Sequence, residues 1–585
     1  MESVRFEIPT CPPSEVEALR RELGVSAAMA QVLVRRGHTG AAAARAFLDA
    51  SEEHSPSRFA GIETAVAPIL ASVRAGERIT VHGDYDVDGI CSTAVLVRTL
   101  RALGGDVDTF IPDRAAGYGL QLDTVRTLAD RGTRLLITAD CAITAVEEVR
   151  AARELGIAVV VSDHHSPRAD GTLPDAPIVH PAICGYPCAE LCATAVAYKL
   201  AQALLEASDA GEAALTRLTR DLDLVALATV ADVVPLLGEN RALLRRGLRA
   251  LAATAKPGLR ALMSVAGVDA SRIAERAIGF ALAPRLNAAG RLYRADAGLE
   301  LLLTEDPARG EEIARELDAA NSERRQIERR IRFEAEAQMA ELGSRDAYVL
   351  TGEGWHAGVI GIVASRMVEQ SGRPVVMVAL DGEHGRGSGR SIPGFDLLGG
   401  LEACSEHLVR FGGHRAAAGV ELERERVEGF AAALAAHAAV AIGAEHPRAV
   451  ERVDAVVDCG ELGLALAEEL GALAPFGRAN EPVCLMIEQA RFLDPRPMGE
   501  GRHLRFTVES ASARARCVRF GEGAALPVGD GEHARATFAL EINEWNGVVE
   551  PRLRLRHATA APLSPERAIP VEQGAALAGE QLALL

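Results

Sequence analysis

The stretch His82-Gly-Asp84-Tyr-Asp86-Val-Asp88-Gly89 places three carboxylates at alternate positions. It follows the apolar run Arg78-Ile-Thr-Val81 and precedes small residues that can begin a helix. Side chains at alternate positions of an extended segment point the same way, so the three aspartates are expected to share one face. Adjacent carboxylates repel one another, and one or two hard divalent cations would neutralise them. The alternative is an acidic turn with helix-capping aspartates, which is common for an isolated Asp-x-Asp.

Further acidic and histidine residues follow two later apolar runs. Leu135-Leu-Ile-Thr-Ala ends at Asp140, and Ala158-Val-Val-Val-Ser ends at Asp163-His164-His165. A helical segment from Thr144 to Leu155 separates these runs, and alternating strands and helices imply a parallel sheet. Ligands of such sheets gather at the carboxyl ends of the strands. The pattern predicts one crevice with one or two histidines and five aspartates: Asp84, Asp86, Asp88, Asp140 and Asp232.

The residue types indicate which metal this crevice would hold. A mixed set of carboxylates and imidazoles favours Mn²⁺ or Mg²⁺ over Zn²⁺, for which more histidine and cysteine is typical. Two such ions about 3.5–4 Å apart can bind the attacking and leaving oxygens of a phosphoryl transfer. The sequence therefore predicts one or two Mn²⁺ or Mg²⁺ ions and phosphoryl-transfer chemistry.

The order Asp-x-Asp, Asp, Asp-His-His, Asp resembles the DHH phosphoesterase superfamily. Longer strings, from about Arg78 to about Leu555, are similar to its RecJ family of 5′-to-3′ exonucleases for single-stranded DNA. Two departures, Ala116 before Gly-Tyr-Gly and Ala142 in place of a usual glycine, concern loop geometry and remove no ligand. The strings are His82 to Gly89, Ile111-Pro-Asp-Arg114 with Gly117-Tyr-Gly-Leu120, Leu222 to Leu236, Pro284-Arg-Leu-Asn-Ala-Ala-Gly-Arg291, Gly387-Ser-Gly-Arg-Ser-Ile392 and Phe411-Gly-Gly-His414.

The resemblance implies roles for individual residues. Catalytic roles are implied for His165, expected beside the scissile phosphate, and for Asp86 and Asp163. A substrate pocket for a 5′-phosphate is implied at Ser388 and Arg390, with Arg114 and either Arg285 or Arg291 nearby; ordinary interdomain salt bridges are the alternative for these arginines. His414 lies in a second glycine-rich string and would add a side-chain donor for phosphate. The implied metal ligands are Asp84, Asp86, Asp88, Asp140, His164 and Asp232.

At 585 residues the chain is too long for one core. Two α/β lobes joined by a long helix and followed by an oligonucleotide-binding β-barrel are expected. No Gly or Pro lies between Glu311 and Leu342, which predicts the long helix. The predicted segments are a helical lead-in (1–58), the DHH metal-binding domain (59–240), a helical region with the connecting helix (241–342), the DHH-associated domain (343–443), the barrel (449–562) and a tail (563–585).

Short strands from Val453 to Arg556 predict the barrel, with five or six antiparallel strands. Its arginines and aromatics are typical of single-strand binding, although each taken singly could equally be a core or ordinary surface residue. The residues are Arg502, His503, Arg505, Phe506, Arg519, Trp545 and Arg556.

The composition contains 63 basic and 81 acidic residues, a net charge of -18. Nucleic-acid binding requires only a local basic track, which is expected from Arg241 through Lys256 to Arg260. The ten cysteines are scattered, which favours reduced thiols over disulfides. No signal-like N-terminus or long apolar run is visible, so a cytoplasmic protein is expected.

Together with the predicted metal site, the resemblance implies a metal-dependent 5′-to-3′ exonuclease that degrades single-stranded DNA to mononucleotides in repair and recombination. The partners it implies are single-stranded DNA, single-strand binding protein and a RecQ-type helicase, and the chain is expected to be a monomer. One alternative is a phosphatase or phosphodiesterase for very short nucleotides, which would not need a barrel. The other is a non-catalytic strand-binding protein, a class that loses metal ligands, whereas this chain keeps them.

Overall fold

The structure is a computed structural model that describes residues 4–113, 118–443, 450–521, 526–529, 531–545 and 547–560. The chain forms two compact units. Of the described residues, the larger unit comprises those within 53–443 together with 477–479, and the barrel unit comprises those within 4–52, 450–476 and 480–560. Arg114, Ala116 and the predicted tail lie outside the described residues.

The first lobe of the larger unit contains a five-stranded sheet in the order β3-β2-β4-β5-β6. All of its neighbouring strands are parallel, which confirms the prediction. The strands are β2 (Arg78–Gly83), β3 (Asp106–Phe110), β4 (Leu135–Ala139), β5 (Ala158–Ser162) and β6 (Ile178–Val179).

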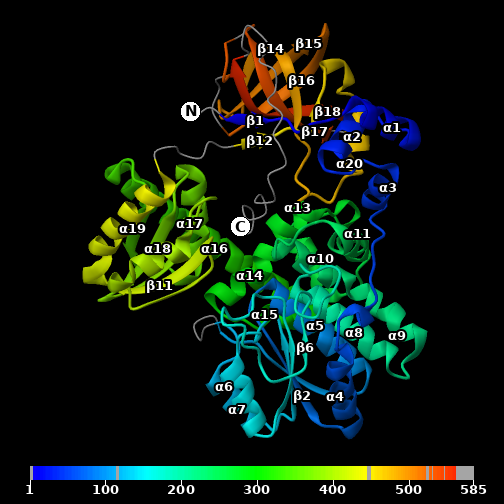
Figure 1. The fold of residues 1–585 in the computed structure, drawn as a ribbon, viewed down its shortest axis with the longest axis vertical. Coiled ribbons are helices and arrows are strands. Elements are labelled where there is room, and N and C mark those ends of the chain that lie inside the picture. Colours follow the sequence, from blue (N-terminus) through cyan, green and yellow to red (C-terminus); the bar gives the residue numbers. More distant parts are fainter. Residues whose placement is uncertain are drawn as a thin grey trace. The chain divides into compact units, whose positions relative to one another are not determined.

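Helices cover both faces of this sheet (Figure 1). Ile79, Val81 and Val160 belong to the apolar core shared with α4, α5 and α8. Leu136, Val159 and Val161 belong to a separate core with α6 and α7. Burial on both faces explains why the central strands β4 and β5 are almost wholly apolar. The helices are α4 (Ile62–Ala75), α5 (Val87–Ala102), α6 (Leu122–Asp130), α7 (Val146–Glu154) and α8 (Ala193–Glu206), preceded by the short helix η1 (Pro56–Arg58).

A helical region follows and ends in the expected long helix, α16 (Pro307–Leu342). Asp306 caps α16 by accepting a hydrogen bond from the amide of Ala308, and Pro307 occupies the first turn, where proline is tolerated. The preceding elements are α9 (Gly211–Leu218), η3 (Thr219–Asp221), α10 (Leu222–Ala231), α11 (Gly238–Ala252), α12 (Pro257–Val265), η4 (Ala270–Arg272), α13 (Glu275–Ala277), the π-helix η5 (Ile278–Leu282), α14 (Ala283–Leu292) and α15 (Ala297–Leu303).

The second lobe of the larger unit is a mixed sheet in the order β10-β11-β9-β8-β7. Only β7 and β8 are parallel within it. Its strands are β7 (Tyr348–Glu353), β8 (Val375–Asp381), β9 (His384–Arg390), β10 (Arg410–Gly413) and β11 (Ala417–Glu423). Its helices are α17 (Ala357–Ser371), α18 (Leu397–Ala403), η6 (Ser405–His407), η7 (Arg424–Arg426) and α19 (Val427–Ile442).

The barrel unit contains a closed sheet, because β14 pairs with both β15 and β17 while β16 pairs with β18. The prediction of a purely antiparallel barrel was wrong: the pairs β13–β14 and β16–β18 are parallel. The elements are β12 (Val450–Arg452), β13 (Ala455–Val456), η8 (Cys459–Glu461), α20 (Leu464–Gly471), β14 (Leu485–Met498), β15 (His503–Ser510), β16 (Ala513–Phe520), β17 (His533–Trp545) and β18 (Val548–Ala560).

The N-terminal segment packs into the core of the barrel unit. Leu19, Met29 and Leu33 are buried in the same apolar cluster as Phe492 and Phe538 of the barrel. β1 (Arg5–Glu7) also pairs in parallel with β12. The helices are α1 (Pro13–Leu23), α2 (Ala27–Arg35) and α3 (Ala41–Asp49).

Two further sequence-based expectations can be compared with the structure. All ten cysteines are free thiols, as expected. The expected basic track is only partly a surface feature. Arg249 and Arg260 are exposed, whereas Arg241 is buried and the Lys256 ammonium forms a buried ion pair with Asp223 at 2.8 Å. Among the described residues, no helix is both long and apolar enough to cross a membrane.

Candidate metal centre

The first aspartate cluster lies at the junction between β2 and α5 and is not an extended segment. β2 ends at Gly83, and Asp86 is the N-cap of α5, accepting hydrogen bonds from the amides of Asp88 and Gly89. The helix-capping alternative therefore holds for Asp86. The predicted strand alternation does not extend to Asp88, which lies in α5, although Asp84 and Asp86 still offer ligand atoms within one group. The turn is tight: a Cβ on Gly89 would lie 2.4 Å from the Asp84 carbonyl oxygen. Only glycine fits there, so the motif sets the backbone path between the carboxylates.

Asp88 is buried and lies against the N-terminus of α8. Its Oδ2 accepts from the amide of Ala193 at 2.7 Å, and its Oδ1 accepts from the amide of Thr194 at 2.7 Å and from its hydroxyl at 2.6 Å. The N-cap residue of α8, Cys192, makes no capping bond of its own. Asp88 therefore supplies the missing cap as a charged acceptor at the positive end of the helix.

Asp140 and His164 bring two ligand-type atoms together in the interior. Asp140 Oδ1 and His164 Nε2 are 3.2 Å apart, and both are buried without a hydrogen-bond partner. The Nδ1 atom of His164 lies 3.1 Å from the Leu191 carbonyl oxygen, to which it donates its proton. The Nε2 lone pair is thereby left for a ligand, as is usual for metal-binding histidines. Buried polar atoms without partners are costly, and a cation shared by these two would satisfy both.

The remaining predicted ligands complete three overlapping groups. Within each group one ligand atom per residue lies within 4.8 Å of the others. Burial, reinforced by neighbouring carboxylates, raises the pKa of Asp140 and of Asp232 well above the usual value. Oxygen-rich sets with one or two imidazoles fit Mn²⁺ or Mg²⁺. The groups are Asp84, Asp86 and Asp140; Asp88, His164 and Asp232; and Asp140, His164 and His165.

His165 and Asp163 form an ion pair at the edge of this cluster. The Nδ1–H of His165 donates to Asp163 Oδ1 at 2.8 Å. Burial alone would lower the pKa of His165, but this bond raises it to about 9. Burial alone would also raise the pKa of Asp163, but the bond from His165 lowers it to about 2. Asp163 is fully buried and also accepts from the Ile143 amide, so it positions His165 and lies behind the cluster.

Tyr118 is a residue of the site that the sequence did not predict. Its hydroxyl donates to the Asp140 carbonyl oxygen at 3.0 Å and lies 2.9 Å from His165 Nδ1. The signal was present in the Gly117-Tyr-Gly-Leu120 string, but no spacing rule relates that string to Asp-His-His. Tyr118 links the backbone of one ligand to the side chain of His165.

The backbone next to Asp140 carries strain. Asp140 and Ala142 have φ of 69° and 82°, in the left-handed region that side chains other than glycine rarely adopt. Ala142 is the position where the resembling family usually has glycine. Alanine at position 142 therefore adopts the backbone conformation that suits glycine, at a cost in conformational energy.

The substrate residues predicted on the second lobe lie at one end of its sheet. On β9, the Arg390 guanidinium donates to Ser388 Oγ at 2.9 Å and to the Gly389 carbonyl oxygen at 2.8 Å. α17 passes close by, because a Cβ on Gly361 would lie 2.9 Å from both side chains. His414 is exposed in the β10–β11 turn, and its amide donates to Ala417, the strand partner of Arg390.

The arginines predicted on α14 have partners within the larger unit. Arg285 Nε pairs with Asp318 of α16 at 2.9 Å. Arg291 donates to the Gly358 carbonyl oxygen in the first turn of α17 at 2.9 Å. Asn287, which the sequence-based list omitted, accepts from the Val87 amide beside Asp86 at 3.1 Å. α14 thus contacts both the metal-site loop and the second lobe.

Two of the expected barrel residues have structural roles. Phe506 is buried in the barrel core, and Arg556 pairs with Glu451. By contrast, Phe520 is partly exposed, with His503 at its edge and the Arg552 guanidinium 5.6 Å from the ring centre. This is an exposed aromatic and basic group of the kind that single-strand binding uses.

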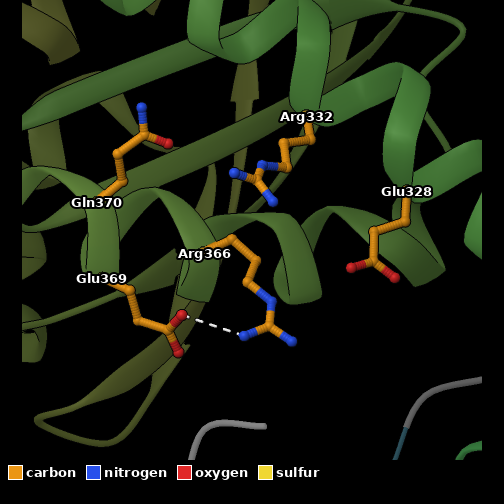
Figure 2. Close-up of a pocket in the computed structure, with 5 residues that line it drawn as sticks. All are labelled: Glu328, Arg332, Arg366, Glu369 and Gln370. Carbon is orange, nitrogen blue, oxygen red and sulfur yellow. Dashed lines mark hydrogen bonds and ion pairs between the residues drawn. The ribbon is translucent and has the colours of Figure 1, made fainter. Parts of the chain in front are cut away.

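A surface pocket between α16 and α17 is separate from these residues (Figure 2). Its two arginines are neutralised locally, since Arg366 pairs with Glu369 at 3.1 Å and Arg332 with Glu336 at 2.8 Å. None of the predicted site residues lines it. The pocket is therefore not the metal centre. The lining residues are Glu328, Arg332, Arg366, Glu369 and Gln370.

The parallel sheet with its Asp/His cluster, the second α/β lobe and the closed barrel together define a DHH-type phosphoesterase. Residues 78–229 match the DHH family, N-terminal domain; residues 345–439 match the DHHA1 domain; and residues 453–557 match the RecJ OB domain. The predicted fold class is thereby confirmed.

Comparison with known proteins identifies the family within this class. The chain is 37% identical over 570 residues to the single-stranded-DNA-specific exonuclease RecJ of Bacillus subtilis (strain 168), covering 95% of this chain and 71% of that protein. The crystal structure of RecJ from Thermus thermophilus in complex with Mn²⁺ matches with a TM-score of 0.81 at 32% identity, covering 96% of this chain and 80% of that one. The corresponding Mg²⁺ complex matches with a TM-score of 0.77 at 30% identity, covering 96% and 79%. The chain belongs to the RecJ family.

Proposed function

We propose that this chain is a Mn²⁺- or Mg²⁺-dependent exonuclease that degrades single-stranded DNA from the 5′ end to mononucleotides, in repair and recombination. The observation that carries the proposal is the buried pair of Asp140 Oδ1 and His164 Nε2, 3.2 Å apart and without hydrogen-bond partners. Family membership adds that relatives with this fold are single-strand-specific exonucleases.

Bound divalent ions would supply an activated water and neutralise charge on the phosphoryl group. The proposed ligands are Asp84, Asp86, Asp88, Asp140, His164 and Asp232, which the geometry supports by grouping them. His165, held as a cation by Asp163, would donate hydrogen bonds to the scissile phosphate. Asp86 would act as a metal ligand and as the helix cap of α5. Asp163 would act indirectly, by holding His165 in position.

The 5′-to-3′ direction of degradation would come from recognition of the terminal 5′-phosphate. A 5′-phosphate carries more negative charge than an internal phosphodiester, and an arginine with a hydroxyl can distinguish the two. Ser388 and Arg390 are proposed for this role because the Arg390 guanidinium lies 2.9 Å from the Ser388 hydroxyl oxygen, so one phosphate could contact both. His414 would assist at the same end of the sheet. Either Arg285 or Arg291 of α14 would contribute, and both are held by contacts within the larger unit. Arg114 is proposed from the resemblance alone.

The finer features follow from the same proposal. We propose that the chain acts as a cytoplasmic monomer, with single-strand binding protein and a RecQ-type helicase as partners. The domain boundaries proposed from the sequence are 59–240 for the DHH domain, 343–443 for the DHH-associated domain and 449–562 for the barrel. The lead-in at 1–58 would support the barrel, in whose core Leu19 and Met29 are buried.

Labelled oligonucleotides test the activity. With Mn²⁺, a 5′-phosphorylated single strand should be shortened from its 5′ end, whereas blunt duplex should resist digestion and EDTA should stop the reaction. Asp232→Ala should lose hydrolysis while retaining strand binding. Digestion from the 3′ end, or cleavage restricted to di- and trinucleotides, would refute the proposal.

The terminal pocket is tested by the ratio of rates on 5′-phosphate and 5′-hydroxyl strands. Arg390→Ala should bring this ratio close to one. Arg386→Ala is a matched control, because Arg386 lies on the same strand and is largely exposed. An unchanged ratio in Arg390→Ala would place the pocket elsewhere.

A further inference from the structure

An exposed aromatic side chain lies on the π-helix between α13 and α14. Phe280, in the middle of η5, is 65% exposed. The guanidinium carbon of Arg276 lies 5.6 Å from the centre of its ring. Single π-helical turns within helices are frequent at functional sites. A guanidinium over one face of an aromatic ring is attracted by the ring's π-electrons. Aromatic side chains are also the groups on which single-strand-binding proteins stack bases.

The neighbours of Phe280 place it beside the proposed metal centre. Gly279 packs against α10, where a Cβ on it would lie 3.5 Å from Val230, two residues before Asp232. At the other end of the segment, Asn287 accepts from the Val87 amide, one residue after Asp86. The segment 279–287 therefore contacts elements that carry two of the proposed ligands. Phe280 and the proposed metal centre therefore lie on elements that contact one another.

We propose that Phe280, with Arg276 over one face of its ring, binds a nucleobase of the single strand close to the scissile phosphate. The proposal deepens the proposed function and rests on it, because the occupant is the single-stranded substrate. A base can stack on the ring face that Arg276 leaves to solvent, while the guanidinium attracts the neighbouring phosphate. Stacking requires an unpaired base, so this subsite would favour single strands over duplex at the point of cleavage.

The test is an abasic scan read by binding. A 5′-phosphorylated dT12 with a 3′ fluorophore, and a series with one abasic residue moved along the strand, are titrated in EDTA by fluorescence anisotropy. For the wild-type protein, one abasic position near the 5′ end should raise Kd about fivefold or more, since base–aromatic stacking contributes that much. In Phe280→Ala that position should lose its effect, and Phe280→Trp should restore it.

Phe333→Ala is the matched control, because Phe333 is 75% exposed on α16 and its removal should leave the abasic profile unchanged. A wild-type profile without a sensitive position, or an unchanged profile in Phe280→Ala, overturns the proposal. A uniform loss of affinity in Phe280→Ala, with the profile retained, also overturns it. Hydrolysis with Mn²⁺ is measured separately, so failure of the proposed function is distinguishable from failure of this subsite.

Discussion

Replacing Asp88 with alanine should destabilise the fold, although Asp88 belongs to a crowded set of carboxylates. Its three hydrogen bonds cap α8, which has no cap of its own. Asp88→Ala would leave the buried amides of Ala193 and Thr194 without an acceptor. Each unsatisfied buried amide costs about 1–3 kcal/mol, so the loss is roughly 2–6 kcal/mol.

An opposing effect reduces this loss. Burial, offset only in part by its neighbours, raises the pKa of Asp88, so its charge is unfavourable in the metal-free protein. Removing that charge recovers part of the cost, and we expect a net loss of about 2–4 kcal/mol. The free energy of unfolding of Asp88→Asn should lie between those of the wild type and Asp88→Ala. The asparagine carbonyl can accept from the Thr194 amide, but its NH₂ group cannot accept from the Ala193 amide.

The measurement is urea unfolding in EDTA, followed by circular dichroism. Asp232→Ala is the control, since burial and the neighbouring Asp88 and Asp86 raise the pKa of Asp232 well above its usual value, so the cost that its removal relieves outweighs the lost attraction to His165 and Arg478. Its midpoint should match or exceed that of the wild type. If Asp88→Ala unfolds at the wild-type urea concentration, the capping role is refuted.

Three further outcomes follow from the site. Ala142→Gly should stabilise the protein by about 1 kcal/mol in thermal unfolding, because φ of 82° suits glycine, and a lower Tm would contradict the strain argument. Folded-state pKa values of Asp140 and Asp232 lie above the unfolded value of about 4, so the native state holds extra protons. The Tm of the metal-free protein should therefore fall as pH rises above about 4, and Mn²⁺ should remove this fall. An equal dependence of Tm on pH with and without Mn²⁺ would count against a shared metal site. Tyr118→Phe should lower kcat about five- to tenfold with KM nearly unchanged, through the lost bond at the Asp140 carbonyl oxygen, and an unchanged kcat would show that Tyr118 does not position the site.

Local sequence patterns were sufficient for the scaffold of the first lobe. The β-branched runs before Asp140 and Asp163 are strands of a parallel sheet, and their carboxyl ends meet at one edge. The path from β2 to α5 could be misread, because Asp-x-Asp-x-Asp fits both strand alternation and helix capping. Which pattern applies depends on the fit of Gly89 against the Asp84 carbonyl, a contact within six residues that alternation alone does not reveal.

The sequence by itself determined the residue types of the metal centre, the alternation of strands and helices, and the long helix α16, because these depend on short-range spacing and on backbone preferences. Only the tertiary structure decided which groups each of these residues touches. Asp88 caps a helix more than one hundred residues away, Arg285 pairs with Asp318, and Lys256 is buried against Asp223. The N-terminal helices pack into a barrel more than four hundred residues further along the chain. Such partners are selected by packing and by the need to satisfy buried polar groups, and neither requirement leaves a periodic trace in the sequence.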